Sequence, residues 1–404
     1  MLEVYLTIFF ISVLLIFLGS GVWVGISMIG VSTIGMMMFT SRPVGDAMAT
    51  TMWSMGSSWS LTALPLFVWM GEILFRTKLS ENLFKGLSPW LSKLPGGLIH
   101  VNILGCAIFA AISGSSAATV ATVGKMSIPE LRKRNYPERF LLGTLAGSGT
   151  LGLLIPPSII LIIYGVTVEE SIAKLFIAGI IPGIGLAFLF MAYVVAWSLK
   201  NKKIMPVISE DFSFIEKIKK SGQLLPVVLL IFAVIGSIYA GIATATEAAS
   251  LGVLGALVLS YFQKSLTKES FTKSLLGATK TSCMIAFILA GSSFLTLAMA
   301  FTGLPKNLAV FIDTLNLSPY MLLLVLTLFY IILGMFLDGI SAVVLTMAII
   351  EPMIRQAGFD MIWFGIYLVI VVEMAQITPP VGFNLFVLQG MAKKDMGFIA
   401  RSAF

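Results

Sequence analysis

Two stretches of the chain combine a small-residue turn with a double proline. The first has Gly114-Ser115-Ser116 followed by Pro156-Pro157, and the second has Asp338-Gly339 followed by Pro379-Pro380. The two double prolines lie 223 residues apart, and Pro129 and Pro352 share this spacing. Proline removes a backbone donor and breaks a helix, which leaves carbonyl oxygens without partners. Carbonyls, hydroxyls and a carboxylate are the hard oxygen ligands that Na⁺ needs, and the ends of half-helices add favourable dipoles.

We predict that each stretch binds a cation at membrane depth, so that the chain holds two or more Na⁺ ions. The predicted sodium ligands in the first stretch are Gly114, Ser116, Thr119, Gly149, Thr150 and Pro156. Those in the second stretch are Asp338, Gly339, Ser341, Thr378 and Pro379. The first set contains no titratable side chain, which favours Na⁺ over H⁺.

An anionic ligand fits between the two turns, because helix N-termini and hydroxyls can bind a carboxylate without a full countercharge. The predicted ligand-lining residues are Ser115, Ser116, Ser292, Ser293 and Ser341.

These assignments have structural alternatives. A kinked helix with small residues packed on a neighbour would show the same glycines and prolines. Asp338 could cap a half-helix, Glu373 could serve a structural hydrogen bond, and Ser292-Ser293 could bond back within their own helix.

The elements that hold these residues are predicted to be membrane helices. Of 404 residues, 58% are hydrophobic and 11% are charged, against about 25% charged in a soluble domain. Apolar runs of about 20 residues can cross a hydrocarbon core about 30 Å thick. The net charge of +7 comes from lysines and arginines in short loops, where they orient helices and meet lipid headgroups. The composition predicts an all-α polytopic membrane protein that contacts lipid and binds no nucleic acid.

Other patterns do not indicate an enzyme. The G-x-G-x-x-G pattern at Gly147–Gly152 has no preceding strand and lies within an apolar helix, so it is not a dinucleotide site. His100 is the only histidine, which leaves no histidine metal site or Ser-His-Asp triad elsewhere in the chain. Cys106 and Cys283 lie in apolar runs, which predicts two buried thiols and no disulfide.

The small-residue turns predict two re-entrant hairpins. Residues 96–123 are too many for one span and too few for two, and a hairpin satisfies both limits. A broken helix is predicted over 140–166. In the second copy, the hairpin is predicted over 320–350 and the broken helix over 362–391.

Polar segments complete the expected layout. Residues 76–93 and 305–315 are predicted to lie along the membrane surface. Basic loops are predicted at 125–139 and 264–280.

Loop charges predict that the two copies are inverted. The loop after the first hairpin carries +3 and the loop after the first broken helix −1, whereas the second copy has −1 and +2 at these places. Basic loops stay cytoplasmic, so the copies lie upside down to each other and the N-terminus is periplasmic. Inverted repeats with broken helices near the midplane are the architecture of secondary transporters.

The predicted parts of the chain are a first scaffold with an interfacial arm (1–95), a first hairpin and broken helix (96–174), a span with a cytoplasmic linker (175–223), a second scaffold with its arm (224–317), and a second hairpin and broken helix (318–404). The counterpart of the span at 175–199 should begin near residue 398, so we expect a truncated C-terminus that lacks the final helix.

Five ordered segments, spread over essentially the whole chain, resemble the large membrane subunit of the tripartite ATP-independent periplasmic (TRAP) transporters, the DctM-like family. The segments are Leu61–Gly71, Gly114–Gly124, Gly149–Ser158, Gly241–Ala249 and Thr378–Asn384. The family usually has Thr-Pro-Thr-Glu where this chain has Thr244-Ala245-Thr246-Glu247, and it usually ends with one more helix.

The resemblance implies a protein of the bacterial inner membrane that takes up an organic acid, such as a C4-dicarboxylate or sialic acid, with sodium. It also implies two protein partners, a periplasmic substrate-binding protein and a small four-helix membrane subunit. The implied mechanism is an elevator, in which the hairpins and broken helices slide against the scaffold. The alternative is a proton-coupled or stand-alone organic-anion transporter of a related inverted-repeat fold, with Asp338 and Glu373 as proton carriers.

Overall fold

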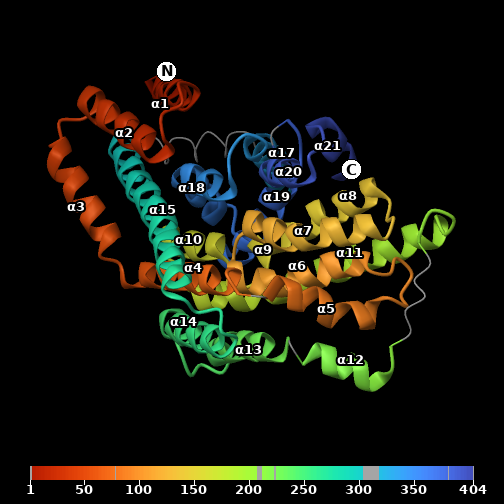
Figure 1. Ribbon diagram of the computed structural model, residues 1–404. Coiled ribbons are helices and arrows are strands. Elements are labelled where there is room, and N and C mark those ends of the chain that lie inside the picture. The colour runs from red at the N-terminus through yellow and green to blue at the C-terminus, as the bar shows by residue number, and fades with distance from the viewer. Residues whose placement is uncertain are drawn as a thin grey trace.

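The computed structural model describes residues 2–77, 79–206, 212–222, 224–303, 318–380 and 382–403. Every regular element within these ranges is a helix (Figure 1). By length and composition, four of the described helices could cross a membrane, or up to seven if each of three bent pairs is one span. The predicted surface segment at 305–315 lies outside the described residues.

The first half runs from α1 to α12. Its helices are α1 (Leu2–Gly19), α2 (Val24–Phe39), α3 (Val44–Gly56), η1 (Trp59–Thr62), α4 (Ala63–Phe75), α5 (Leu79–Leu91), α6 (Ile99–Ser113), α7 (Ser116–Lys133), α8 (Glu138–Gly149), α9 (Leu151–Leu154), α10 (Ile159–Thr167), α11 (Ile172–Lys200) and α12 (Phe214–Ser221).

The second half runs from α13 to α21. Its described helices are α13 (Leu225–Tyr239), α14 (Ala245–Phe262), α15 (Lys268–Thr302), α17 (Pro319–Gly334), α18 (Gly339–Gln356), α19 (Met361–Gln376), α20 (Phe383–Ala392) and α21 (Met396–Ala403).

The 223-residue offset relates the two halves helix by helix, which confirms the predicted repeat. Helix α18 begins and ends 223 residues after α7. Helices α1, α2, α6, α8 and α10 have their counterparts in α13, α14, α17, α19 and α20. The copies differ at one place, because α3 and the following η1–α4 segment bend by 54°, whereas the corresponding residues form the single helix α15. The bend follows Gly56-Ser57-Ser58, which are weak helix formers.

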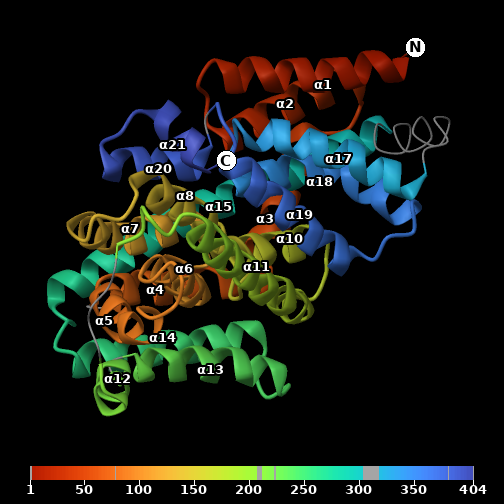
Figure 2. The same ribbon diagram turned by 90° about the vertical axis from the view of Figure 1, so that its right-hand side faces the viewer.

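The scaffold helices of each half pack on scaffold helices of the other half. Helix α4 packs on α14 of the other half, and α15 packs on α2. The pairs α1–α2 and α13–α14 lie at opposite ends of the molecule, with the hairpins between them (Figure 2). Large apolar side chains point outward on the outer helices, including Ile181 on α11 and Phe232 on α13, as expected for surfaces that meet lipid.

The hairpins and broken helices also pair across the halves. The second segment of each broken helix packs on the outgoing arm of the other hairpin, α20 on α7 and α10 on α18. This arrangement agrees with the inverted repeat predicted from the loop charges.

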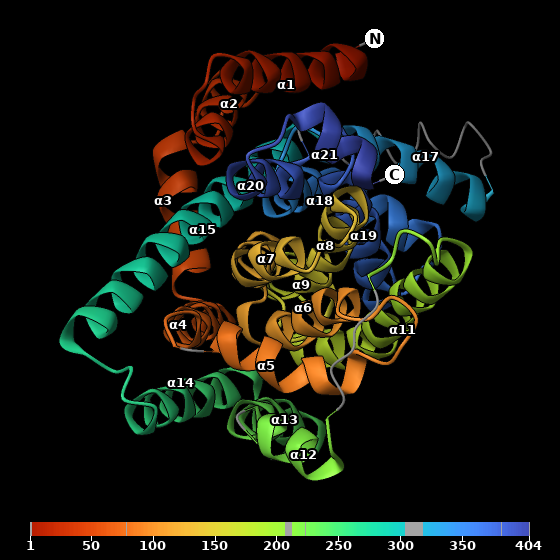
Figure 3. The same ribbon diagram turned by 45° about the vertical axis from the view of Figure 1, so that its right-hand side comes forward.

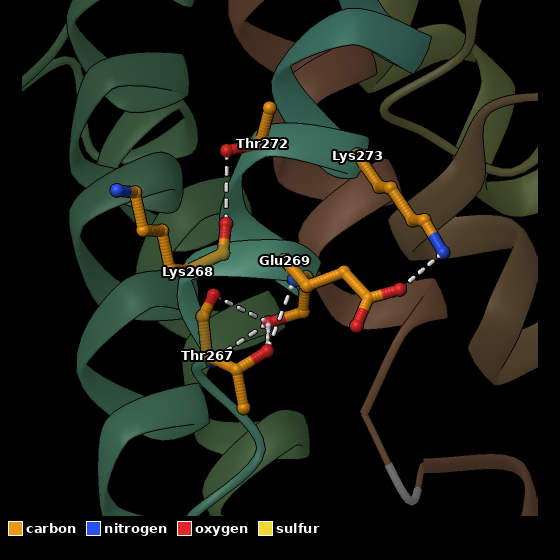
Figure 4. A network of polar contacts seen from close by, with 6 residues as sticks. Thr267, Lys268, Glu269, Thr272 and Lys273 are labelled. Carbon is orange, nitrogen blue, oxygen red and sulfur yellow. Dashed lines mark hydrogen bonds and ion pairs between the residues drawn. The ribbon is translucent and has the colours of Figure 1, made fainter.

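Two predicted basic loops are helical instead. Lys125–Lys133 belongs to α7, and residues 268–280 form the first part of α15. A helix of 35 residues is about 52 Å long and exceeds a hydrocarbon core of about 30 Å, so its charged turns can lie outside the apolar layer. Figure 4 shows this end of α15, where Thr267 accepts a hydrogen bond from the Ser270 backbone at 3.0 Å and Glu269 pairs with Lys273 at 2.5 Å.

The two cysteines are free thiols, as predicted, but only Cys106 is buried. Cys283 is exposed on α15. The prediction of two buried thiols was wrong for Cys283 because a lipid-facing surface is as apolar in sequence as a packed core.

Candidate functional site

The first hairpin turns at Gly114. This glycine ends α6 with a φ of +58°, and a Cβ added to it would lie 2.7 Å from the Pro157 carbonyl oxygen. Only glycine fits this left-handed, crowded position. The Ile159 backbone N–H donates to the Gly114 carbonyl at 3.2 Å, so the hairpin tip is bound to the break in the following helix.

A cluster of oxygen atoms lies behind this tip. Thr119, which is fully buried, donates to the Ser115 carbonyl at 2.8 Å and shares a hydrogen bond of 2.9 Å with Ser113. A Cβ at Gly152 would lie 2.6 Å from the Ser115 carbonyl and 2.7 Å from the Thr119 hydroxyl. The broken helix therefore approaches two oxygens, the Ser115 carbonyl and the Thr119 hydroxyl, with its bare backbone. Ser113 was missed from the sequence, although it immediately precedes the Gly114-Ser115-Ser116 turn.

The helix break itself lies at Ile155–Ser158, between α9 and α10. The Pro156-Pro157 peptide bond is cis. Ser158 donates to the Leu153 carbonyl and accepts from the Leu161 backbone at 3.4 Å. Leu153 therefore does not have the free carbonyl expected upstream of the prolines, because the Ser158 side chain occupies it. Thr150 donates to the Gly147 carbonyl at 2.7 Å, and Gly149 abuts Val120 of α7.

The second copy has similar connections between its hairpin tip and its helix break. Asp338 caps α18 by accepting from the Ser341 backbone at 3.1 Å, as Ser115 caps α7 by accepting from Ala118 at 3.5 Å. The Gly382 N–H, at the position that corresponds to Ile159, donates to the Met335 carbonyl at 3.3 Å. This acceptor lies two residues before Leu337, the counterpart of Gly114. Of the two roles considered for Asp338, the structure shows the cap.

The ligand residues predicted after the second tip lie at the break between α19 and α20. Thr378 donates to the Met374 carbonyl at 2.6 Å, which closes the last turn of α19. The Pro379-Pro380 peptide bond is cis. Gly339 packs on α19, where an added Cβ would lie 2.8 Å from Val372, and Ser341 is buried in the first turn of α18.

Gln376 connects the two tips. Its side-chain oxygen accepts a hydrogen bond of 2.7 Å from Ser116, 260 residues away in the first hairpin. A Cβ added to Gly339 would lie 2.6 Å from its side-chain nitrogen. Both tips therefore meet at the last turn of α19, with Gln376 buried between them. The sequence did not single out Gln376, because a glutamine inside an apolar helix has no spacing or motif of its own.

Glu373 lies one turn before Gln376 and is 2% exposed. Neither of its carboxylate oxygens has a hydrogen-bond partner among the described residues. A carboxyl group at membrane depth without partners is costly, and such groups are commonly functional.

The five serines predicted to line a ligand fall into two groups. Ser115, Ser116 and Ser341 lie at or near the tips, whereas Ser292 and Ser293 line a cavity of about 950 Å³ elsewhere. This cavity lies between α3, α15 and the loop that contains Glu169 and Glu170. No lysine or arginine is among the described residues that line it. Ser292 also donates to the Val344 carbonyl of α18 at 2.7 Å, so it binds the scaffold to the second hairpin.

Two arginines connect the hairpin of each copy to the broken helix of the other copy by hydrogen bonds. Arg132 at the end of α7 donates to the Ala392 carbonyl at 2.8 Å, and Arg355 at the end of α18 donates to the Val168 carbonyl at 3.1 Å. The arginines lie 223 residues apart, and each reaches the C-terminal end of the other copy's broken helix, where a cation is favoured. Lys394 adds an ion pair with Glu138 at 3.1 Å.

The sequence matches the family described as "Tripartite ATP-independent periplasmic transporter, DctM component" over residues 11–403. The chain belongs to the DctM family. It is therefore a transporter component and not an enzyme, and its helices belong to a multi-pass inner-membrane protein of a tripartite system.

Relatives of this DctM component include the C4-dicarboxylate TRAP transporter large permease protein of Pseudomonas aeruginosa. The two are 33% identical over 88% of this chain and 83% of the relative. The isethionate TRAP transporter permease protein DctMQ of Oleidesulfovibrio alaskensis is 33% identical over 87% of this chain and 55% of that protein.

Among solved structures, the Alcanivorax borkumensis YdaH transporter has the same fold as this DctM component. The superposition has a TM-score of 0.64 at 11% identity and covers 88% of this chain and 83% of the other. At that identity the likeness concerns the fold alone.

Proposed function

We propose that this DctM component carries an organic acid, such as a C4-dicarboxylate or sialic acid, into the cell together with two or more Na⁺ ions. The observation that carries the proposal is the meeting of both hairpin tips at Gln376, beside the breaks in both helices. Sites of this kind bind substrate and ions in inverted-repeat transporters. The N-terminus is periplasmic, and a periplasmic binding protein and a small four-helix membrane subunit complete the system.

The oxygen cluster behind the first tip supports sodium as the coupling ion. The Thr119 hydroxyl, the Ser113 hydroxyl and the Ser115 carbonyl lie within hydrogen-bond distance of one another. All three are neutral oxygens of the kind that coordinate Na⁺ where a membrane helix unwinds. A second cation site is proposed at the other tip, around Asp338 and Thr378.

The reciprocal contacts support an elevator. The hydrogen bonds from Arg132 and Arg355 join the two hairpin–broken-helix elements into one body. The cavity of about 950 Å³ separates part of this body from α3 and α15 of the scaffold. We propose that the joined elements move as a unit against α15, with the Ser292–Val344 hydrogen bond broken and remade.

Reconstitution tests the proposed function. Proteoliposomes with the complete tripartite system should accumulate a labelled organic acid only when its binding protein is present and Na⁺ is higher outside. Vesicles with this chain alone should stay empty, because no described part of it forms a large domain outside the membrane that could capture the substrate. Uptake of free substrate by the chain alone, or uptake that ignores the sodium gradient, would contradict the proposal.

The second candidate function is proton coupling, and the buried, unpartnered Glu373 favours it. The substitution Glu373→Gln removes the titratable group while keeping the shape of the side chain. If sodium drives uptake, the variant should keep the wild-type dependence of initial rate on external Na⁺, measured at fixed membrane potential and at two pH values. If protons drive uptake, the variant should lose uptake driven by a pH gradient, and sodium coupling would be wrong.

A further inference from the structure

A second large cavity is lined by basic residues from more than one helix. It has a volume of about 600 Å³ and lies between α5, α7 and the residues at either end of α12. Figure 3 shows α5 between the first hairpin and the α12–α13 segment. The described lining residues are Phe84, Lys85, Ser88, Pro89, Lys125, Met126, Pro129, Glu130, Arg134, Phe212 and Lys220. None of these lining residues belongs to the hairpin tips or to the oxygen cluster proposed to bind Na⁺.

The charges in this cavity favour an anion. Four of the described lining residues are cationic and only Glu130 is anionic. Glu130 forms an ion pair of 3.0 Å with Arg134 on the same helix. The cations come from three separate elements, with Lys85 on α5, Lys125 on α7 and Lys220 on α12, so they converge on the cavity through the tertiary structure.

Apart from Ser88, the uncharged lining residues are apolar or aromatic, which favours an amphiphile over a small soluble anion. Phe84, Met126 and Phe212 form part of the wall, and the Lys220 ammonium lies 3.9 Å from the centre of the Phe212 ring. A lysine ammonium that lies over an aromatic ring in the wall of a cavity is suited to an anionic headgroup at a membrane interface.

The arm that forms one wall has the features of an interfacial helix. Trp90 on α5 is 43% exposed, and its indole N–H donates to Ser221 of the α12 segment at 2.7 Å. Ser221 in turn donates to the Gly86 carbonyl at 3.1 Å. Exposed tryptophans and lysines mark the depth of lipid headgroups, and these two hydrogen bonds hold α5 and α12 together as one wall.

We propose that this cavity binds an anionic phospholipid, with the phosphate between Lys85, Lys125 and Lys220 and the acyl chains along the apolar wall. Helix α7 belongs to the hairpin that moves in the proposed elevator, whereas α5 and α12 belong to the arm and linker. The lipid connects the moving hairpin to the arm and linker, so the transport rate depends on the anionic lipid content of the membrane. The binding claim stands apart from the proposed function, because it concerns lipid retention by the purified chain.

The test compares two triple variants of the full chain. The cavity variant carries Lys85→Gln, Lys125→Gln and Lys220→Gln. The control variant carries Lys133→Gln, Lys200→Gln and Lys203→Gln, which removes the same charge from exposed lysines that do not line the cavity. After delipidation, phosphatidylglycerol or phosphatidylcholine is titrated into each protein, and bound lipid is counted by native mass spectrometry. Thermal unfolding of both variants checks that the fold is retained.

The cavity variant should bind phosphatidylglycerol on the order of 100-fold more weakly than wild type, since each lysine near a headgroup contributes about 1 kcal/mol. The control variant should bind it as wild type does, and phosphatidylcholine should bind weakly to all three proteins. Equal retention of phosphatidylglycerol by the cavity and control variants would overturn the proposal. Displacement of the lipid by millimolar glycerol phosphate or succinate would also overturn it, because the cavity would then be a site for soluble anions.

Discussion

Uptake should fall to background when Thr296 of α15 and Glu169 of the loop after α10 are joined covalently, and it should return when the link is broken. Both side chains are exposed and line the same cavity of about 950 Å³, one from the scaffold and one from the first broken-helix element. If the element must slide past α15, a short tether between them stops the cycle. The experiment uses Thr296→Cys with Glu169→Cys in a background without Cys106 and Cys283, a reducible bifunctional thiol reagent, and uptake by the reconstituted transporter.

A matched crosslink within the moving body should have no such effect. Glu138 and Lys394 form an ion pair of 3.1 Å between the two halves, and both side chains are partly exposed. Cysteines at these two positions, treated with the same reagent, should leave uptake at the rate of the untreated double variant. Full transport with the Thr296–Glu169 tether in place would mean that the elements stay fixed during transport. Loss of transport with the Glu138–Lys394 tether would mean that the two halves do not move as one body.

The second large effect is expected from Thr119→Val, which removes a buried hydroxyl but keeps the branched shape of the side chain. The Thr119 hydroxyl is one of two oxygens that face Gly152, and it shares a hydrogen bond with the Ser113 hydroxyl. Loss of a buried polar partner costs about 1–3 kcal/mol, so the external Na⁺ concentration for half-maximal uptake should rise by about tenfold or more. The measurement is the initial uptake rate against Na⁺ at constant ionic strength and membrane potential.

Thr119→Ser is the control, because it retains the hydroxyl and should keep a sodium dependence close to that of wild type. A purely structural role would lower the maximal rate or the amount of folded protein in Thr119→Val without moving the sodium curve. Such an unmoved curve would remove this cluster from the sodium site. Recovery of the maximal rate at high Na⁺ is the result expected of an ion ligand.

Much of the architecture could be predicted because its causes are local. Gly114, the double prolines and the apolar run lengths act within a few turns of helix, so the hairpin tips and breaks lie where glycine and proline place them. The 223-residue repeat also made each local pattern visible twice. Loop charges predicted the inversion, and the reciprocal packing of α20 on α7 and α10 on α18 agrees with it.

The errors arose where local chemistry does not decide the outcome. The charges at 268–280 resembled a loop, but they lie on α15, which continues beyond the length of a single span. Cys283 lies in an apolar run, but its helix turns it outward. A sequence shows that a segment is apolar, whereas only the assembled bundle separates the side that meets lipid from the side that meets protein.

Composition, periodicity and backbone-breaking residues act over short distances, so the class of protein, the repeat and the two small-residue tips could be predicted. Which groups meet depends instead on how the helices pack. Gln376 joins Ser116, Arg132 reaches Ala392, and the Ser158 side chain occupies the Leu153 carbonyl. The first two of these contacts join groups 260 residues apart. They depend on how the two inverted halves pack against each other. A local sequence pattern cannot predict contacts of this kind.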